Sequence, residues 1–362
     1  MRDNRISAAR IAALLSIGLA VGVTAPSTAR AQQPAPASFP VNPDLSAESR
    51  QFDFWIGEWD VNLRVRQEDI SWEDSHDAVA RIYPILGGKA VLELWDEQRI
   101  KGFSIRYFDT DRKRWVLWLN WPGMNRSGSS MLVGEFRHGR GEFYSAKARP
   151  DGVQSVSRYT FSDITPNSLR WDDAYSADGG KTWSNSWIME FTRSGGIPTL
   201  PPVGEAMPTF DGGDRCPDEE FRRYEFLEGA RQGGAEIHDD DWKPLGAVTM
   251  TGYRVLDGCA LIVFLRWGQG AGAEELFAQI TWNSYSGRYE LLTLDSDPDT
   301  PARVYFSEED AEELLFLELV DGAPGPRRVH IVTGTDGFIG WIDEIRRDDG
   351  WWESWRARFG GE

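Results

Sequence analysis

The chain has 362 residues, with 39 basic and 57 acidic side chains and a formal net charge of −18 at pH 7. This acidic balance makes nucleic-acid backbones and anionic membrane surfaces unfavourable partners, and solubility is its simplest explanation. Two cysteines are too few for a disulfide framework, so a packed core must supply most of the stability.

Residues 1–31 have the pattern of a signal peptide. An apolar stretch over residues 11–23, too short for an ordinary membrane span, follows three arginines, Arg2, Arg5 and Arg10. The sequence Ala-Arg-Ala at residues 29–31 fits a cleavage site, so we expect cleavage after Ala31 and a periplasmic or secreted protein. A retained N-terminal anchor helix is the alternative. No span is expected in the mature chain.

The remaining chain divides at segments rich in Pro, Gly, Ala and Ser. Residues 32–49 are typical of a flexible leader, and the Pro/Gly-rich residues 196–215 are typical of a linker. These boundaries predict one domain over residues 50–195 and a second, more divergent domain over residues 216–362.

An internal repeat relates these two segments. The run FDFWIGEW at residues 52–59 is echoed by YEFLEG at residues 224–229, and further matches keep the same order along both halves. Trp171 corresponds to Trp341, and Trp187 corresponds to Trp355. Two copies at this long period indicate a tandem duplication rather than a solenoid.

Both halves are predicted to be almost entirely β-strand. In the first half, runs of alternating polarity rich in Val, Ile, Phe, Tyr and Trp cover residues 91–95, 103–108, 115–121, 141–148, 155–161 and 183–191. Turn residues separate them, which favours a sandwich or a barrel of short antiparallel strands. Short helical turns at residues 48–54 and 219–227 are expected to precede the first strand of each half.

The sequence around Gly57-Glu58-Trp59 resembles the entrance motif of lipocalin and calycin barrels. The fuller string FDFWIGEWDV resembles that of an uncharacterised bacterial lipocalin-like domain family. The likeness covers residues 52–193 well. It is weaker over residues 224–359, where Gly229-Ala230-Arg231 lacks the tryptophan. This resemblance implies an all-β fold of two tandem antiparallel up-and-down barrels, each preceded by a short helix.

The same resemblance implies a structural role for the motif. Trp59 would plug the closed end of the first barrel, with Arg193 from the last strand packed over its ring. Gly57 would allow the helix end and the strand to approach closely. The alternative is that the aromatic run forms part of a ligand site.

A second local pattern occurs at residues 176–183, SADGGKTW, which resembles the Asp-box of sialidase-type propellers. A degenerate copy occupies residues 348–351. One box in each half, without repeats of blade length, indicates a stable hairpin rather than a propeller glycosidase.

No metal or cofactor site is predicted. The four histidines share no zinc-binding spacing, and nucleotide-binding fingerprints are missing from the sequence. Residues 295–299, DSDPD, resemble the start of a calcium loop but lack its central glycine and distal glutamate.

Tryptophan is the remaining signal, with 17 residues in the chain. Its simplest interpretation is an aromatic core, and the sharper one is a barrel mouth that holds a small hydrophobic ligand. The candidate ligand-binding residues are Glu93, Trp95, Arg106, Trp118, Asn120, Arg158, Trp171 and Trp187.

Three functions remain open at this point. The first is an exported small-molecule-binding protein, the second an envelope interaction protein with filled barrels, and the third an enzyme such as an isomerase, cyclase or hydrolase. The sequence also leaves open whether Cys216 and Cys259 form a disulfide or two free thiols, and what oligomeric state the protein adopts.

Overall fold

A computed structural model describes residues 39–97, 100–122, 129–202, 205, 216, 219–268, 273–309, 313–320 and 323–360. The expected signal peptide and residues 32–38 of the expected leader lie outside these residues. Among the described residues, no helix has the length and apolar character needed to cross a membrane.

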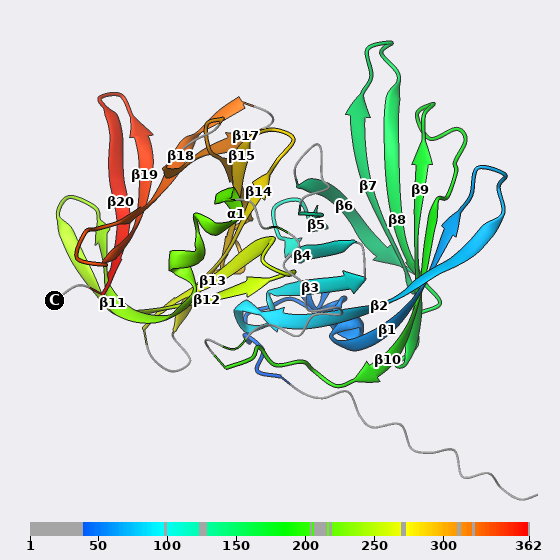
Figure 1. Cartoon of the computed structure of the whole chain (residues 1–362), viewed down its shortest axis with the longest axis horizontal. Coiled ribbons are helices and arrows are strands. Elements are labelled where there is room, and N and C mark those ends of the chain that lie inside the picture. Colours follow the sequence, from blue (N-terminus) through cyan, green and yellow to red (C-terminus); the bar gives the residue numbers. More distant parts are fainter. Residues whose placement is uncertain are drawn as a thin grey trace, which may run out of the picture. The chain divides into compact units, whose positions relative to one another are not determined.

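The first half of the described chain closes into an antiparallel barrel in which β10 pairs back with β1 (Figure 1). Its strands are β1 (Gly57–Arg66), β2 (Trp72–Ile85), β3 (Ala90–Glu97), β4 (Lys101–Asp109), β5 (Arg114–Asn120), β6 (Ser130–Arg137), β7 (Arg140–Ala148), β8 (Gln154–Ser162), β9 (Ser168–Ser176) and β10 (Trp187–Gly195). The 3₁₀ turns η1 (Glu48–Arg50) and η2 (Asp53–Trp55) precede β1, and η3 (Leu86–Gly88) separates β2 from β3. We call this unit barrel 1.

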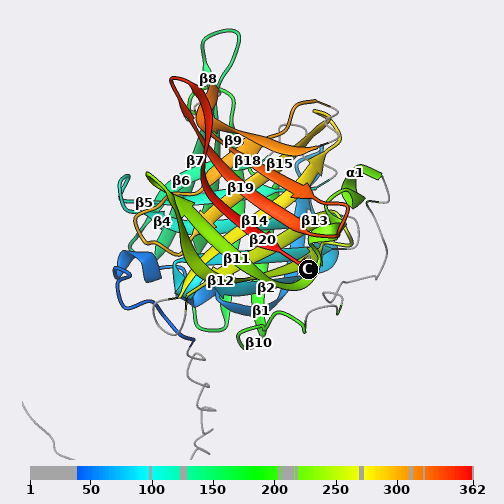
Figure 2. The same cartoon turned by 90° about the vertical axis from the view of Figure 1, so that its left-hand side faces the viewer.

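The second half forms barrel 2, in which β20 pairs back with β11 (Figure 2). Its strands are β11 (Gly229–His238), β12 (Trp242–Val255), β13 (Ala260–Trp267), β14 (Glu274–Asn283), β15 (Arg288–Asp295), β16 (Arg303–Phe306), β17 (Leu314–Val320), β18 (Ala323–Thr333), β19 (Ile339–Arg347) and β20 (Gly350–Phe359). Helix α1 (Glu219–Arg222) and η4 (Glu225–Leu227) precede β11. The prediction of two tandem antiparallel barrels with short preceding helices is confirmed.

One predicted strand begins later than expected. The run over residues 183–191 was expected to be continuous, but β10 starts at Trp187. The reason is the Asp-box turn, in which the Asp178 carboxylate accepts hydrogen bonds from the backbone of Lys181 and Thr182. The turn is followed only by an isolated bridge between Tyr175 and Ser184.

Strand alternation places one set of side chains inside each barrel and the other set outside. In β3, Val91 and Trp95 pack into the interior of barrel 1, whereas Leu92 and Leu94 belong to a buried cluster that also contains residues of barrel 2. Every residue of β3 is therefore buried. An antiparallel strand with both faces covered loses the polar alternation that a half-exposed strand would show.

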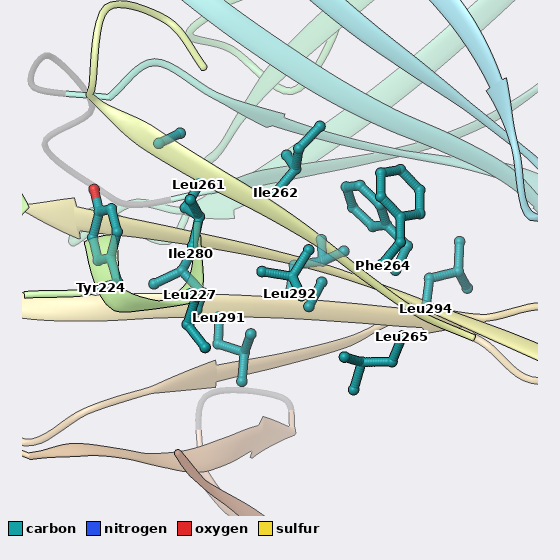
Figure 3. Close-up of a cluster of buried hydrophobic side chains, with 14 of the residues drawn as sticks. Tyr224, Leu227, Leu261, Ile262, Phe264, Leu265, Ile280, Leu291, Leu292 and Leu294 are labelled. Atoms are coloured by element: carbon teal, nitrogen blue, oxygen red, sulfur yellow. The ribbon is translucent and has the colours of Figure 1, made fainter. Parts of the chain in front are cut away.

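Apolar side chains of both barrels share this second cluster. Ile105 and Tyr107 of β4 join it from barrel 1, and Ile262 and Phe264 of β13 join it from barrel 2. Figure 3 shows the barrel 2 part, where side chains leave both faces of the strands. The two barrels are thus parts of one packed body rather than independent units on a linker.

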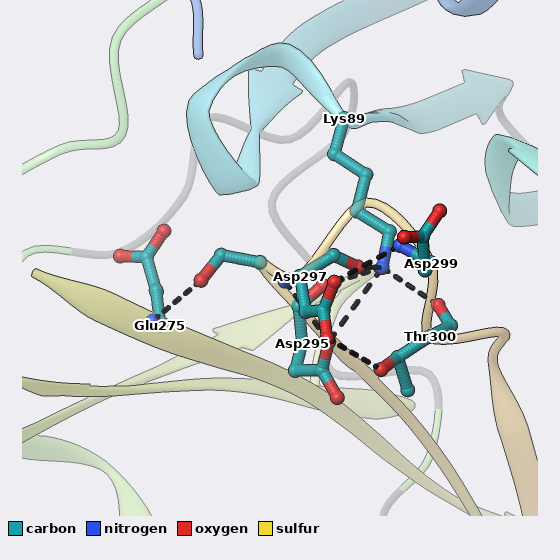
Figure 4. A network of polar contacts seen from close by, with 7 residues as sticks. Lys89, Glu275, Asp295, Asp297, Asp299 and Thr300 are labelled. Atoms are coloured by element: carbon teal, nitrogen blue, oxygen red, sulfur yellow. Dashed lines mark hydrogen bonds and ion pairs between the residues drawn. The ribbon is translucent and has the colours of Figure 1, made fainter. Parts of the chain in front are cut away.

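Buried polar groups cross the same interface. The Lys89 ammonium, 2% exposed, donates to the carbonyl oxygens of Asp295 (2.9 Å), Asp297 and Thr300 (2.7 Å) (Figure 4). Burial lowers the pKa of Lys89, and the nearby Asp295 and Asp297 oppose that effect. The loop that resembles the start of a calcium site therefore directs its carbonyl oxygens at a lysine of the other barrel.

Two further polar contacts join the barrels. Lys101 Nζ lies 2.9 Å from Asp257 Oδ2, and it also bonds Asp96 within barrel 1. The buried Glu290 carboxylate accepts hydrogen bonds from Asn120 Nδ2 at 3.2 Å and from the Ser129 backbone at 3.0 Å. These contacts fix the register of one barrel against the other as well as adding to its apolar packing.

A disulfide joins Cys216 to Cys259. Of the two alternatives left open by the sequence, the structure contains the bridge. It fastens the segment before α1 to the turn that opens β13, so the start of the second half is held against its own barrel.

Candidate functional site

The closed end of barrel 1 is built from the aromatic motif. Trp59 is completely buried, and its indole Nε1 donates to the Trp55 carbonyl at 2.7 Å. The Arg193 guanidinium lies 4.1 Å from the centre of the Trp59 ring and donates to the carbonyl oxygens of Phe54 and Ile56. Gly57 adopts φ +144°, and a Cβ there would come within 2.0 Å of Arg193 Nη1. These four features close the barrel and leave no space for a ligand beside Trp59.

Above this floor lies a buried ion pair. Arg106 Nη2 is 3.0 Å from Glu93 Oε2, which also accepts a 2.7 Å hydrogen bond from Ser104. The Arg106 guanidinium lies 3.6 Å from the centre of the Trp55 ring. Burial raises the pKa of Glu93, opposed by Arg106 and Ser104, and burial lowers the pKa of Arg106 to about 10. Only Nη2 of Arg106 is paired in this way, because its buried Nε and Nη1 have no hydrogen-bond partner among the described residues and the guanidinium otherwise contacts aromatic rings.

Three tryptophans pack against one another further along barrel 1. Trp95 and Trp187 have ring centres 5.7 Å apart, and each lies within 5.7 Å of Trp121. Trp171 packs against Tyr159 on the same interior surface, at 4.8 Å. Five of the eight candidate ligand-binding residues therefore face the interior of barrel 1: Glu93, Trp95, Arg106, Trp171 and Trp187.

The other three candidates do not join them. Trp118 and Asn120 lie on the outer face of β5, where Trp118 packs on the cluster shared by the barrels and Asn120 bonds Glu290. Arg158 lies on the outer face of β8, with its guanidinium 4.5 Å from the Trp183 ring centre. Asn120 and Arg158 were chosen as polar groups that point into the barrel, and the structure places both on its outside. Both faces of β5 are apolar, so polarity could not tell its inner from its outer face.

A cavity of about 1470 Å³ extends from the groove between the barrels into barrel 2. One part of its lining comes from the groove between the barrels and includes Tyr83, Leu86, Leu200 and Phe264. The other part comes from the inner face of barrel 2: Trp267, Leu276, Thr293, Arg303, Tyr305, Arg327, Asp343 and Trp355.

Strand register explains why this second group faces inward. Glu290 of β15 bonds residues of barrel 1, so it points outward, and Leu291 and Thr293 must point into barrel 2. Directly paired residues share a face. Thr293 pairs with Arg303, and Leu291 pairs with Tyr305, which brings both side chains to the lumen. Asp343 pairs with Val329 on one side and Trp355 on the other.

The polar residues of the lumen form an incompletely paired cluster. Arg303 Nε lies 3.6 Å from Glu318 Oε1. In the described part of the chain, Arg327 makes no hydrogen bond and no ion pair. Asp343 is partly covered as a whole residue, but its Oδ1 is fully buried and has no hydrogen-bond partner. Arg327 and Asp343 both line the cavity, so its wall, as far as the structure describes the chain, contains a guanidinium without a hydrogen bond and a carboxyl group with one buried, unpaired oxygen.

The cluster perturbs its acidic groups. Burial raises the pKa of Asp343 to about 6, while Arg327 and Arg303 oppose this rise and Glu318 and Glu344 add to it. Burial also raises the pKa of the Tyr305 hydroxyl. Asp343 thus changes its charge near neutral pH, unlike an ordinary aspartate.

An apolar wall completes the lumen. The rings of Trp267 and Trp355 lie 5.8 Å apart, and Trp267 Nε1 is anchored by a 3.0 Å hydrogen bond to Glu274. Leu276 lies on the same face of β14 as Glu274, the residue that pairs with Trp267. The cavity therefore offers flat aromatic surface together with a few converging polar groups, as small-molecule sites do.

Replacing Asp343 by asparagine should alter the pH dependence of stability. Because the folded pKa of about 6 exceeds the ordinary aspartate value of 3.8, the ionised carboxylate costs the native state stability above pH 6. Below about pH 4 both states are protonated and the cost vanishes. We expect Asp343→Asn to gain about 1–2 kcal/mol relative to wild type between pH 4 and pH 8, by urea denaturation.

The exposed Asp74 is a matched control, since Asp74→Asn removes a carboxylate that is 72% exposed. Its stability difference from wild type should change little over the same pH range. An Asp343→Asn difference that is equally flat between pH 4 and pH 8 would contradict a raised pKa at this site.

The residues of this cavity were missed by the sequence interpretation, because all eight of its candidate ligand-binding residues lie in the first half. Arg303, Arg327 and Asp343 come from three strands and share no motif. One signal was present, because the repeat pairs Trp355 with Trp187, a residue that was selected. Among the described residues, no cluster of His, Cys, Asp and Glu has the geometry of a metal site.

Comparisons with known proteins add little to this picture. No protein-family model and no curated protein matches the chain. Among solved structures, a DUF3598-family protein of unknown function from Nostoc punctiforme is 10% identical, with a TM-score of 0.25, covering 87% of this chain and 98% of its own. The dehydratase domain from the CurK module of the curacin polyketide synthase is also 10% identical, with a TM-score of 0.13, covering 49% of this chain and 79% of its own. At these TM-scores neither similarity carries information about function.

Proposed function

We propose that this protein binds a small, largely apolar molecule in the lumen of barrel 2. The carrying observation is the cavity that extends from the groove between the barrels into this lumen and has Trp267 and Trp355 on its wall. The whole cavity, of about 1470 Å³, is larger than the roughly 300–1,000 Å³ typical of small-molecule sites, and the lumen is one part of it. The resemblance to lipocalin-like barrels supports the same function, with the site in the second barrel rather than the first.

Export forms part of this proposal. The arginine-rich start, the short apolar stretch and the Ala-Arg-Ala sequence of residues 1–31 support a periplasmic or secreted binding protein. Mass spectrometry of the protein from its own host should find a mature chain that begins at Gln32. An intact N-terminus in the exported fraction would contradict cleavage.

The repeat supplies a matched pair of variants to test ligand binding. The probe is Nile red, a neutral apolar dye, which should bind saturably to the wild-type protein and become fluorescent when bound. Trp355→Ala removes apolar wall from the barrel 2 cavity, and we expect it to weaken Nile red binding about tenfold, or about 1.4 kcal/mol. Trp187→Ala, at the corresponding position of barrel 1, should leave the affinity within about twofold.

The reverse pattern, with Trp187→Ala alone weakening the dye, would place the site in barrel 1. Absence of saturable binding by the wild-type protein would contradict a ligand-binding function. Circular dichroism of each variant would establish that the barrels remain folded.

A second candidate function is an enzyme that uses the same cavity. Asp343 favours it, because a carboxyl with a pKa near 6 suits general acid–base catalysis at neutral pH. An enzyme would change its ligand chemically during incubation, and Asp343→Asn would stop that change while binding persisted. Recovery of an unaltered ligand would favour the binding protein.

A further inference from the structure

We infer that the ligand of barrel 2 is an amphiphilic monocarboxylate, with its acid group between Arg327 and Asp343 and its chain along Trp267 and Trp355. This inference rests on the proposed function and specifies the chemical class of ligand. It follows from three features of the lumen: its charges, its unpaired polar atoms and the position of its apolar wall.

The charges of the cluster favour one negative group on the ligand. Arg303 and Arg327 contribute two positive charges, and Glu318 compensates Arg303 at 3.6 Å. If Asp343 is protonated, one positive charge remains at Arg327, which a monoanion neutralises. A dianion would leave excess negative charge, and a neutral or cationic group would leave the Arg327 guanidinium uncompensated in a partly desolvated site.

The unpaired atoms favour a carboxylate among the monoanions. A planar guanidinium binds carboxylate oxygens through parallel hydrogen bonds. The buried Asp343 Oδ1 lacks a partner. A protonated Asp343 carboxyl could donate to a carboxylate oxygen of the ligand, as two carboxyl groups that share a site hold one proton between them. Arg327 and the Asp343 carboxyl group, which both line the cavity, would then hold the same acid group.

The apolar wall lies next to this polar cluster. Trp355 pairs directly with Asp343 across β19 and β20, and Trp267 packs on Trp355 at 5.8 Å. The apolar chain of a ligand whose acid group lies at Asp343 would therefore lie directly against the rings of Trp355 and Trp267. Each buried methylene adds about 0.8 kcal/mol, so the chain would supply affinity and the acid group selectivity.

The inference also predicts a pH dependence. The charged groups around Asp343 are Arg303 on β16, Glu318 on β17, Arg327 on β18 and Glu344 on β19. Glu344 is held by Arg328 at 2.6 Å, so its charge is compensated outside the lumen. Binding of a carboxylate should take up a proton at Asp343, and affinity should therefore fall as the pH rises above about 6.

The test compares three compounds of equal chain length that differ only in the head group. Dodecanoate, dodecan-1-ol and dodecylammonium are titrated against the full protein by displacement of Nile red at pH 6.5. We expect dodecanoate to bind at least tenfold more tightly than the alcohol or the amine, and to weaken by severalfold between pH 6.5 and pH 8.

Variants of two arginines assign the selectivity. Arg327→Met should abolish the preference for dodecanoate over dodecan-1-ol, while Arg327→Lys should retain part of it. Arg346→Met removes the same charge from an exposed position of β19 and should preserve the preference. If Arg327→Met does not fold, Arg327→Lys and the three-compound comparison on the wild-type protein still decide the question.

The outcomes separate this inference from the proposed function. Equal affinity for all three compounds, or tightest binding of dodecylammonium, would overturn the acid head group but leave ligand binding intact. Failure of all three compounds and of Nile red to bind would overturn both. A preference for dodecanoate that survives Arg327→Met would remove the assignment to Arg327.

Discussion

Trp59→Ala is expected to lower the free energy of unfolding by ~3–5 kcal/mol, the usual loss for a fully buried large aromatic side chain. The variant empties the closed end of barrel 1 and removes the partner of the Arg193 guanidinium, which lies 4.1 Å from the ring centre. It also removes the 2.7 Å hydrogen bond from the indole to Trp55. Relaxation cannot fill the space, because Arg193 is itself held by the carbonyl oxygens of Phe54 and Ile56.

Urea denaturation followed by circular dichroism measures this loss. Tyr175→Ala is the control, since Tyr175 is an aromatic residue of the same barrel but is 48% exposed. Its loss should stay within about 0.5 kcal/mol. A loss below ~1 kcal/mol for Trp59→Ala would show that Trp59 does not close the barrel.

The fold could be predicted because its signals are local. Alternating strands, tight turns and the aromatic run before β1 each indicate a barrel without knowledge of distant contacts. The packing of Arg193 on Trp59 is not a local signal, and it was expected only from the resemblance to lipocalin-like barrels, which places an arginine of the last strand over the motif tryptophan. The duplication helped further, because a second copy makes a weak pattern hard to attribute to chance.

The site could not be predicted because its position depends on how the barrels pack. An apolar Trp118 and a buried Asn120 would indicate lumen positions only if the outer face of β5 were exposed to water. The second barrel covers that face, so apolar and buried polar residues occur on both sides of the strand. Burial on both faces removes the information that alternation would otherwise provide.

The cavity residues show a second limit. Arg303, Arg327 and Asp343 meet only because β16, β18 and β19 surround one lumen, and no spacing in the sequence connects them. Trp355 carried the only sequence signal, through its match to Trp187. The same repeat position is thus packed against Trp95 and Trp121 in barrel 1 and lines a cavity in barrel 2.

Lys89→Met should cost about 2–4 kcal/mol, the second largest effect that we expect. The substitution keeps the apolar stem but removes the ammonium that the carbonyl oxygens of Asp295, Asp297 and Thr300 share. These acceptors would lose a charged donor in a buried interface, and hydrogen bonds to charged groups contribute roughly 1.5–3 kcal/mol each. The desolvation of Lys89, which lowers its pKa, offsets part of that sum.

Lys181→Met is the control, because Lys181 is exposed in the Asp-box turn and its side chain should contribute little. Hydrogen exchange provides a second readout, since Lys89→Met should speed exchange in the loop after β15 more than in the closed end of barrel 1. A loss below ~1 kcal/mol with unchanged exchange would show that the apolar cluster alone joins the barrels.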